Sequence, residues 1–373
     1  MKIPVSAEQP EAADAAELTP AATPAPSGAE SALDIPTTAY GVAIAELRRL
    51  LTAWLRHEPG ARLGHDPEEL HQLRVTARRI DATLGLFRRQ LPPALVRARK
   101  TTKAVLRTLG AARDLDVQLS ELERYTAHLP ESERLAAEPL RARLQSERGR
   151  ARARMLRGLD SEPTRRWLET LTQAVAEHGD TNNRDPAMVV MPERVRRRFR
   201  KLRKSVGKLR GKSSMDDYHL VRRRAKQLRY ATECGAVMFG KPAEDMLIAL
   251  RRLQDGLGAQ QDAYMAQNHL ATLAAADPAS GLPPATLFLM GRLAEHHARV
   301  TAQARETLAR SWRKVRGKRW RALRARLGEL RANAEAANGT GDAAHPMAAD
   351  DLSPADTNLA AQAPPSESRP VKH

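Results

Sequence analysis

A stretch that combines one histidine with three arginines lies near the start of the chain, and a similar stretch recurs 148 positions later. Residues 70–80 read Leu-His-Gln-Leu-Arg-Val-Thr-Ala-Arg-Arg-Ile, and residues 218–228 read Tyr-His-Leu-Val-Arg-Arg-Arg-Ala-Lys-Gln-Leu. Both follow the pattern His-x-x-Arg-x-x-Ala-[Arg/Lys]-x-[Ile/Leu], with apolar residues three or four positions apart, as on one face of a helix. This recurrence predicts that the chain folds as two related halves.

The similarity continues beyond these two stretches, because residues 71–114 correspond to residues 219–262 without a gap. The pairs related by the same offset include Lys103 and Arg251, Gly110 and Gly258, and Asp114 and Asp262. A fixed spacing over this length indicates an internal duplication rather than the chance periodicity of two amphipathic helices.

Capping residues and prolines mark where helices begin. Asp66 and Pro67 form such a start in the first half, and Ser214 stands at the corresponding place in the second. Pro59 and Gly60 are expected to end the helix before it. The predicted helices cover residues 39–57, 67–90, 93–127, 131–158 and 163–178, and then 192–208, 214–239, 242–276 and 284–332.

No sustained run of alternating β-branched residues predicts a strand. The expected fold class is therefore all-α, with two four-helix bundles of long antiparallel helices related by a pseudo-two-fold axis. The first half is expected to span residues 39–178 and the second half residues 192–332. Residues 179–191, which contain Asn-Asn and Asp-Pro pairs, are interpreted as the linker.

The net charge of +18 is distributed unevenly along the chain. Residues 1–38 carry a net charge of −5 and residues 333–373 carry −4, so residues 39–332 carry +27. Both ends are rich in Ala, Pro and acidic residues and are predicted to be disordered tails. A charge this large on the middle of the chain predicts a polyanionic partner.

The composition also bears on the compartment. Cys234 is the only cysteine, which excludes an internal disulfide and suits a reducing cytosol. No apolar run approaches the length of a membrane span, and the N-terminal residues do not resemble a secretory signal. We therefore expect a cytoplasmic protein, and the sequence leaves its oligomeric state open.

The His, Arg and Arg/Lys positions of the repeated stretch fall together on one side of their helix, next to the apolar stripe. A guanidinium group donates two hydrogen bonds at once to a phosphate, and histidine adds a donor whose charge varies near neutral pH. Because two copies of a merely solvated face need not keep the same residue types at the same offsets, we favour an anion-binding role. These positions are His71, Arg74 and Arg78 in one half and His219, Arg222 and Lys226 in the other, with Lys103, Arg107, Arg251 and Arg252 on the helices that follow.

Each half also places a glycine and an aspartate one turn apart on the helix that follows. A glycine inside a helix costs roughly 1 kcal/mol relative to alanine, so another helix is expected to approach closely at Gly110 and Gly258. Asp114 and Asp262 are expected to orient a basic side chain of the neighbouring helix.

Two other functions are compatible with these residues. The two aspartates could join His71 and His219 in a two-His, two-carboxylate metal site of a phosphohydrolase, although the surrounding cations would oppose a divalent ion. The charge of the middle of the chain also permits nucleic-acid binding, but no nucleic-acid motif is present and the Trp and Phe residues are not interleaved with the basic stripes.

Four segments resemble the CHAD domain (conserved histidine α-helical domain) in order and with matched spacing. Residues 71–80 and 109–117 resemble its first half, and residues 219–230 and 253–262 resemble its second half. The resemblance covers about residues 39–332. It implies two four-helix bundles around a basic central groove or pore, in a non-catalytic bacterial domain that binds inorganic polyphosphate and is targeted to polyphosphate granules, with no cofactor or metal.

The candidate polyphosphate-binding residues are His71, Arg74, Arg78, Arg79, Lys103, Arg107, His219, Arg222, Arg223, Lys226, Arg229, Arg251 and Arg252. Asp114, Asp262 and Tyr230 are expected to support them. The chain departs from the family pattern at Asp81, where relatives often have Arg, and at Gly85, so the first half is expected to bind less strongly. Many relatives carry an upstream triphosphate tunnel domain, for which residues 1–38 are too short, so no hydrolase activity is expected.

Overall fold

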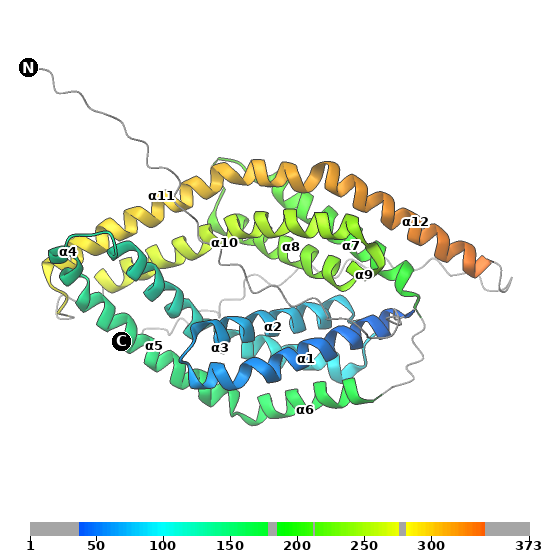
Figure 1. Cartoon of the computed structure of the whole chain (residues 1–373), viewed down its shortest axis with the longest axis horizontal. Helices are drawn as coiled ribbons and strands as arrows, with labels where there is room; N and C mark the ends of the chain where they lie inside the picture. The colour runs from blue at the N-terminus through cyan, green and yellow to red at the C-terminus, as the bar shows by residue number, and fades with distance from the viewer. Residues whose placement is uncertain (1–36, 178–184, 212, 276–280, 340–373) are drawn as a thin grey trace, which may run out of the picture.

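The computed structural model describes residues 37–177, 185–211, 213–275 and 281–339, and this part of the chain contains helices and no β-strand (Figure 1). The all-α class is confirmed. The helices of the first half are α1 (Ala39–Leu63), α2 (Pro67–Leu86), α3 (Pro93–Thr126), α4 (Glu131–Ala136), α5 (Glu138–Leu159) and α6 (Glu162–Ala176). Those of the second half are α7 (Ala187–Lys208), α8 (Met215–Cys234), α9 (Ala236–Phe239), α10 (Lys241–Ala275), α11 (Pro284–Lys314) and α12 (Trp320–Gly339), with a π-helical segment (Val315–Arg319) between the last two.

The two equivalent helices that carry the repeated stretches begin at side-chain caps. Asp66 accepts a hydrogen bond from the backbone N–H of Glu68 at 2.8 Å, and Pro67 occupies the first position of α2. At the start of α8, Ser214 and Asp217 form a reciprocal capping box. These caps satisfy backbone N–H groups that the first turn of a helix leaves without partners.

The prediction that the first helix ends at Pro59 and Gly60 is wrong, because α1 continues to Leu63. The buried Ala61 packs in the core, and the guanidinium of Arg152 donates hydrogen bonds to carbonyl groups in the last turn of α1. These tertiary contacts offset the backbone hydrogen bond that a proline removes. The helix ends instead at Gly64, which adopts a left-handed φ of 71°.

The predicted start of the second half at Pro192 is also wrong, since α7 begins at Ala187 and includes the proline. The backbone N–H of Ala187 donates to the carbonyl of Thr37 at 2.8 Å, and Ala187 is fully buried. The predicted linker therefore ends before Ala187, and its residues 179–184 lie outside the described residues. Thr37 likewise belongs to the folded body, whereas residues 1–36 of the predicted tail are not described.

Three of the long predicted helices are interrupted, and Ala137 separates α4 from α5 within the helix predicted over residues 131–158. Gly235 separates α8 from α9, and a Cβ at this position would lie 2.3 Å from the ring of Phe239. The last helix bends at Gly317, whose ψ of −130° is not helical, and then continues to Gly339. Residues 333–339, predicted to be part of a disordered tail, are therefore helical.

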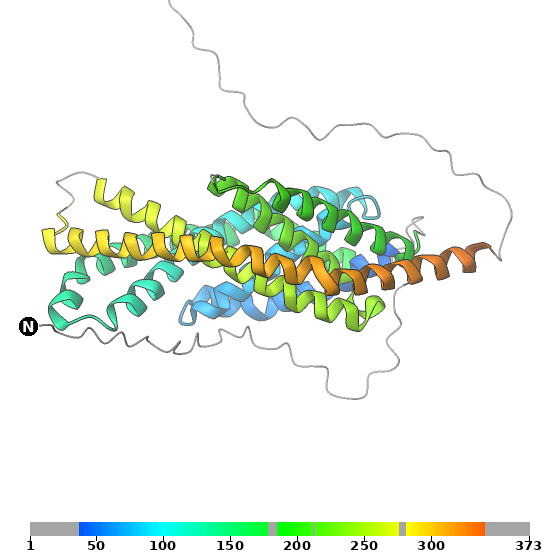
Figure 2. The same ribbon diagram turned by 90° about the horizontal axis from the view of Figure 1, so that it is seen from above.

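The helices are long and run side by side in an elongated body (Figure 1). Seen from above, α11 and α12 form an almost continuous rod that crosses nearly the whole length of the molecule (Figure 2). The two halves meet where α2 packs against α8, and again at one end, where α4 contacts α11. The core consists mainly of Leu and Ala, with stacked rings of Phe199 and Trp320 and an edge-to-face pair of Trp54 and Trp167.

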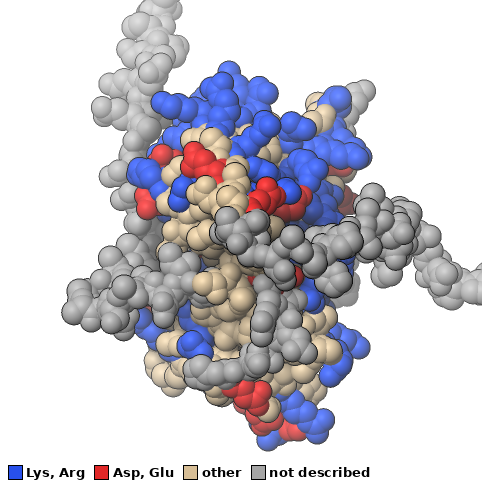
Figure 3. Space-filling model, turned by 90° about the vertical axis from the view of Figure 1, so that its right-hand side faces the viewer, with Lys and Arg blue, Asp and Glu red and all other residues tan. Residues whose placement is uncertain are grey.

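On the face seen in Figure 3, the positive charge is distributed unevenly. Lys and Arg side chains gather over the upper half of the end view in Figure 3, on the side of the molecule where α12 lies in Figure 1. Within the described residues, no helix is both long enough and apolar enough to span a membrane.

Candidate anion-binding site

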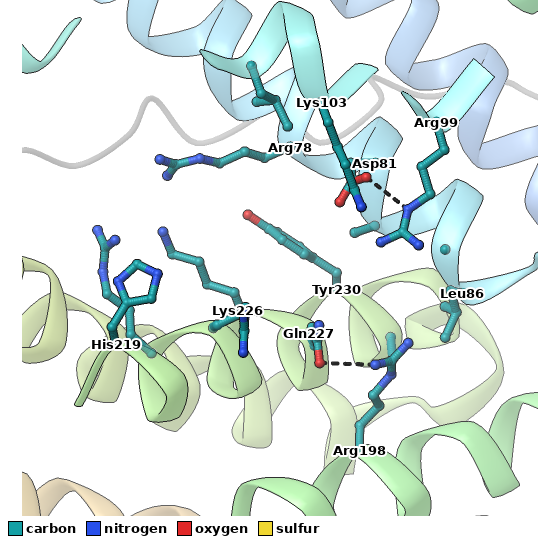
Figure 4. Close-up of a pocket in the computed structure, with 16 residues that line it drawn as sticks. Arg78, Asp81, Leu86, Arg99, Lys103, Arg198, His219, Lys226, Gln227 and Tyr230 are labelled. Carbon is teal, nitrogen blue, oxygen red and sulfur yellow. Dashed lines mark hydrogen bonds and ion pairs between the residues drawn. The ribbon is translucent and has the colours of Figure 1, made fainter. Parts of the chain in front are cut away.

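A cavity of about 460 Å³ opens where α2 and α3 of the first half face α7 and α8 of the second (Figure 4). Its basic lining residues are Arg78, Arg99, Lys103, Arg198, His219, Arg222, Arg223 and Lys226. One carboxylate, Asp81, is also part of this lining. The excess of cations suits a ligand that presents several negative charges.

Predicted residues from both copies of the repeat reach this cavity. Arg78 and Lys103 come from the first half, and His219, Arg222, Arg223, Lys226 and Tyr230 come from α8. Figure 4 shows Lys226 extending from α8 into the space between the ring of His219 and the guanidinium of Arg78. The two repeated stretches thus contribute to one shared cavity.

Two predicted arginines are held by the aspartates of the repeat. Arg74 Nη2 lies 3.4 Å from Asp114 Oδ1, and Arg222 Nη2 lies 3.9 Å from Asp262 Oδ1. Each aspartate therefore lies where it can orient the arginine of the neighbouring helix. Burial lowers the pKa of both Arg74 and Arg222, and Asp114 and Asp262 each partly oppose the lowering at both arginines.

The two helical glycines make room for these arginines rather than for another helix. A Cβ added at Gly110 would lie 3.5 Å from Nη2 of Arg74, and one at Gly258 would lie 3.8 Å from Nη2 of Arg222. No backbone atom of a neighbouring helix is among the contacts found at either glycine in the described structure. The expectation of a close helix–helix approach is therefore wrong.

Arg99 is a cation of the cavity that the sequence did not single out. Its Nε donates to Asp81 Oδ1 at 2.9 Å, and its guanidinium lies over Gly85, where a Cβ would be 2.9 Å from Cζ. Asp81 and Gly85, interpreted as departures that weaken the first half, thus hold and accommodate a different arginine. The sequence did contain a signal for this arginine, because a carboxylate at Asp81 and a position without a side chain at Gly85 occur one helical turn apart.

Arg198 of α7 is a second unpredicted cation, and its Nη1 donates to Gln227 Oε1 at 3.0 Å (Figure 4). Burial and repulsion by Arg197, Arg99 and Arg224 lower its pKa. The gap-free correspondence of residues 71–114 with residues 219–262 does not extend to α7, so only the density of arginines on this helix could have suggested Arg198.

Other predicted residues lie outside the lining of the cavity. Arg229 Nε is 3.3 Å from Glu233 Oε1, and Arg79 Nη2 is 3.4 Å from Glu233 Oε2. The Arg79 pair connects α2 with α8 and helps to join the two halves, whereas the Arg229 pair lies within α8. Arg107, Arg251 and Arg252 are exposed and do not line the cavity.

The two histidines have different surroundings. His219 lines the cavity, and its Nδ1 lies 3.2 Å from Gln261 Oε1. His71 does not line the cavity, and Arg113 occupies the position equivalent to Gln261. Burial and then repulsion by Arg113 lower the pKa of His71. At neutral pH His71 is therefore an uncharged side chain in a basic environment.

The cations in and beside the cavity are crowded and partly desolvated. Burial, followed by repulsion from Arg222, Arg78 and Arg74, lowers the pKa of Lys226 to about 6. Burial and repulsion by Arg78 lower the pKa of Arg74 to about 10. An anion placed among these groups would relieve their mutual repulsion.

No group of three or more His, Cys, Asp or Glu side chains within the described residues is arranged to hold a metal ion. The two histidines and two aspartates of the repeat therefore do not form the metal site considered as an alternative. The aspartates instead lie against arginines.

The model of the CHAD domain family matches residues 45–271, which include both repeated stretches and the cavity. The chain belongs to the CHAD domain family. This match ends within α10, so α11 and α12 lie beyond the matched part of the CHAD domain.

Two curated relatives of this CHAD domain chain are the uncharacterized proteins MT2285 and Rv2226 of Mycobacterium tuberculosis. Each is 27% identical, over 262 and 266 residues respectively, and each match covers 66% of this chain and 48% of the relative. The chain thus spans about half the length of the curated relatives it matches.

Two solved structures share the fold. PptA from Streptomyces chartreusis has a TM-score of 0.60 at 21% identity, and the match covers 74% of this chain and 100% of that one. The crystal structure of the CHAD domain from the plant Ricinus communis has a TM-score of 0.55 at 25% identity, covering 83% of this chain and 98% of that one.

Proposed function

We propose that this CHAD domain binds inorganic polyphosphate in the basic cavity between its two halves and carries out no chemistry on it. The observation that carries the proposal is the convergence of cations from α2, α3, α7 and α8 on one space. Polyphosphate has a negative charge on each phosphate and no bases, so its recognition requires closely spaced cations and no aromatic stacking surface.

The paired arginines support this function. Arg74 and Arg222 come from equivalent positions of the repeat, and in both the Nε atom is buried without a hydrogen-bond partner among the described residues. A buried donor of this kind is costly unless a ligand or water satisfies it. In our proposal the two halves are related by a pseudo-two-fold axis and bind successive phosphates of one polyphosphate molecule along a groove.

A non-catalytic role is supported by the composition of the cavity. Asp81 is the carboxylate in its lining, and this carboxylate is occupied by Arg99. A general base or a set of acidic metal ligands is what phosphate-ester and anhydride hydrolysis ordinarily requires. Binding without turnover suits a cytoplasmic protein that associates with polyphosphate granules, and we include that location in the proposal.

Nucleic acid is the competing ligand, because the surface cations seen in Figure 3 attract any polyanion. A competition assay separates the two. Labelled long-chain polyphosphate would be bound to the full chain and displaced with unlabelled polyphosphate or duplex DNA at equal phosphate concentration. We expect polyphosphate to displace the probe at a concentration at least about tenfold lower, and equal potency of the DNA would remove the claim of specificity.

Catalysis is checked in the same preparation. Long-chain polyphosphate would be incubated with the full chain and magnesium or manganese, and released phosphate would be measured. We expect no release above the protein-free control. Release that His219→Ala abolishes would replace the binding function with a phosphohydrolase.

A further inference from the structure

Among the described residues, Lys226 lines the cavity without an opposing partner, as Arg78, Lys103 and Arg223 also do. Within the described part of the chain, no hydrogen bond or ion pair joins its Nζ to another side chain. In the same cavity, by contrast, Arg99 is held by Asp81 and Arg198 by Gln227. Lys226 is therefore a primary amine whose reactive end is directed into an anion-binding space (Figure 4).

We propose that Lys226 is a site of covalent acylation by acyl phosphates, small compounds in which a carbonyl carbon is bonded directly to a phosphate. The arginines around the amine supply the recognition, because Arg78 and Arg222 line the same cavity and a guanidinium donates two hydrogen bonds to a phosphate. A bound phosphate group places the adjoining carbonyl carbon within the same cavity as the amine.

The reaction balances without any further reactant. The lone pair of Lys226 Nζ attacks the carbonyl carbon, and a C–N bond forms as the C–O bond to phosphate breaks. The electron pair of the broken bond leaves on the phosphate oxygen, and the proton lost by the amine passes to the departing phosphate. The products are an amide on Lys226 and inorganic phosphate.

The state of the amine favours this reaction. Burial and neighbouring arginines lower the pKa of Lys226 to about 6, so the nucleophilic, unprotonated form predominates at neutral pH. Lys241 provides the opposite case. It is exposed, lies 3.4 Å from Glu244 and 3.6 Å from Asp245, and its pKa is raised by these carboxylates.

Acylation of Lys226 is expected to weaken polyphosphate binding, and this part of the inference rests on the proposed function. A protonated Lys226 adds a cation to the bound state, whereas an amide cannot be protonated and also occupies space in the cavity. We expect acylated protein to bind polyphosphate several-fold more weakly than unmodified protein, about three- to tenfold in dissociation constant. Acylation would thereby tune the affinity of the cavity.

The test treats the full chain with acetyl phosphate at pH 7.5 and follows acetylation of each lysine by mass spectrometry. Lys226 is compared with Lys103, which is exposed in the same cavity, and with Lys241 on the surface. We expect Lys226 to react at least about tenfold faster than either, because burial among arginines leaves its own amine largely unprotonated at this pH. Equal rates at the three lysines would overturn the proposal.

Two further measurements separate phosphate recognition from simple nucleophilicity. Inorganic phosphate should slow acetylation of Lys226 by acetyl phosphate and leave Lys241 unaffected. The preference for Lys226 should also shrink when a neutral acetyl donor, an N-hydroxysuccinimide ester, replaces acetyl phosphate. If neither change occurs, the arginines do not guide the reagent and the assignment to acyl phosphates is wrong.

Two variants separate acetylation of Lys226 from polyphosphate binding. In Lys226→Arg the amine is absent while a cation remains, so acetyl phosphate treatment should no longer weaken polyphosphate binding, whereas Lys241→Arg should behave as the parent protein does. Acetylation at Lys226 without any polyphosphate binding would contradict only the proposed function. Polyphosphate binding without selective acetylation would contradict only the present inference.

Discussion

Arg74 and Asp114 form an ion pair at 3.4 Å between α2 and α3, and the equivalent Arg222 and Asp262 repeat it at 3.9 Å between α8 and α10. In both copies the guanidinium passes over a helical glycine to reach the carboxylate. This repeated unit of arginine, glycine and aspartate explains why the same residue types occur at three equivalent positions of the two halves. It also fixes two cations near the junction of the halves.

The carboxylate of this unit is expected to stabilise the fold modestly. Asp262→Asn leaves the largely buried Arg222 facing other arginines, and we expect the free energy of unfolding to fall by about 0.5–1 kcal/mol, since the aspartate is half-exposed and screened by solvent. Urea denaturation measures the change. Glu295→Gln, which removes an exposed pair with Arg299, is the control and should have almost no effect. Equal effects of the two substitutions would contradict the role given to Asp262.

The effect of replacing Gly258, the glycine of this unit in the second half, is expected to depend on the size of the new side chain. Gly258→Ala should stabilise α10 by up to about 1 kcal/mol, because the added Cβ meets Arg222 only at an ordinary contact distance of 3.8 Å. Gly258→Leu should displace the guanidinium and weaken polyphosphate binding by about threefold or more. Fluorescence anisotropy with labelled polyphosphate measures this effect. Loss of binding in the alanine variant would show that another helix, not an arginine, requires the glycine.

Arg99 is expected to contribute to binding although it lies outside the repeated motifs. Arg99→Ala should weaken polyphosphate binding by about fivefold and reduce the slope of its salt dependence by about 1. Arg97, two residues earlier on α3, is exposed and absent from the lining, so Arg97→Ala is a control with the same change of charge. If both variants weaken binding equally, only the overall charge matters and the cavity is not the site.

Polyphosphate binding is expected to be coupled to proton uptake at Lys226. In the free protein burial and the cations Arg222, Arg78 and Arg74 outweigh Asp262 and hold the pKa of Lys226 at about 6. A bound polyanion raises this pKa, so binding takes up a proton and the affinity falls as the pH rises above about 6. Calorimetry between pH 7.5 and 9, in buffers of different ionisation enthalpy, measures the uptake.

The variant that isolates this effect is Lys226→Met, which retains the apolar stem and removes the amine. We expect it to abolish the part of the proton uptake seen in that pH range. An unchanged uptake in the methionine variant would assign the proton to another group. The group that takes up the proton would then be another residue of the cavity lining.

Much of the fold could be predicted from local sequence signals. The helix boundaries that were predicted wrongly at two prolines share one cause. Asp66 and Ser214 marked two helix starts correctly because a cap acts on its own helix. Pro59 and Pro192 were interpreted as breaks, yet both lie inside helices, since buried residues such as Ala61 and Met191 hold the chain there. Contacts between segments distant in sequence, which no local pattern contains, decided these boundaries.

The site was predictable to the extent that the duplication contains it. The repeat identified Arg78, His219 and Lys226, all of which line the cavity. It could not separate them from Arg229, which is drawn instead to Glu233 at 3.3 Å. It also missed Arg198, because α7 contributes a cation without belonging to the repeated motif. The partner of each arginine depends on the three-dimensional position of a few carboxylates.

The measurement that tests the binding site most directly is the affinity of the full chain for long-chain polyphosphate in two triple variants, each of which replaces three basic residues by alanine. One variant combines Arg74→Ala, Arg222→Ala and Lys226→Ala at the junction of the halves. The other combines Arg203→Ala, Arg310→Ala and Arg324→Ala, three exposed arginines outside the cavity. Circular dichroism would confirm that both remain helical.

We expect the junction variant to lose affinity by about a hundredfold or more and the surface variant by less than about tenfold, at the same salt concentration. Unchanged affinity in a folded junction variant, or an equal loss in both variants, would contradict the claim that polyphosphate binds between the two halves.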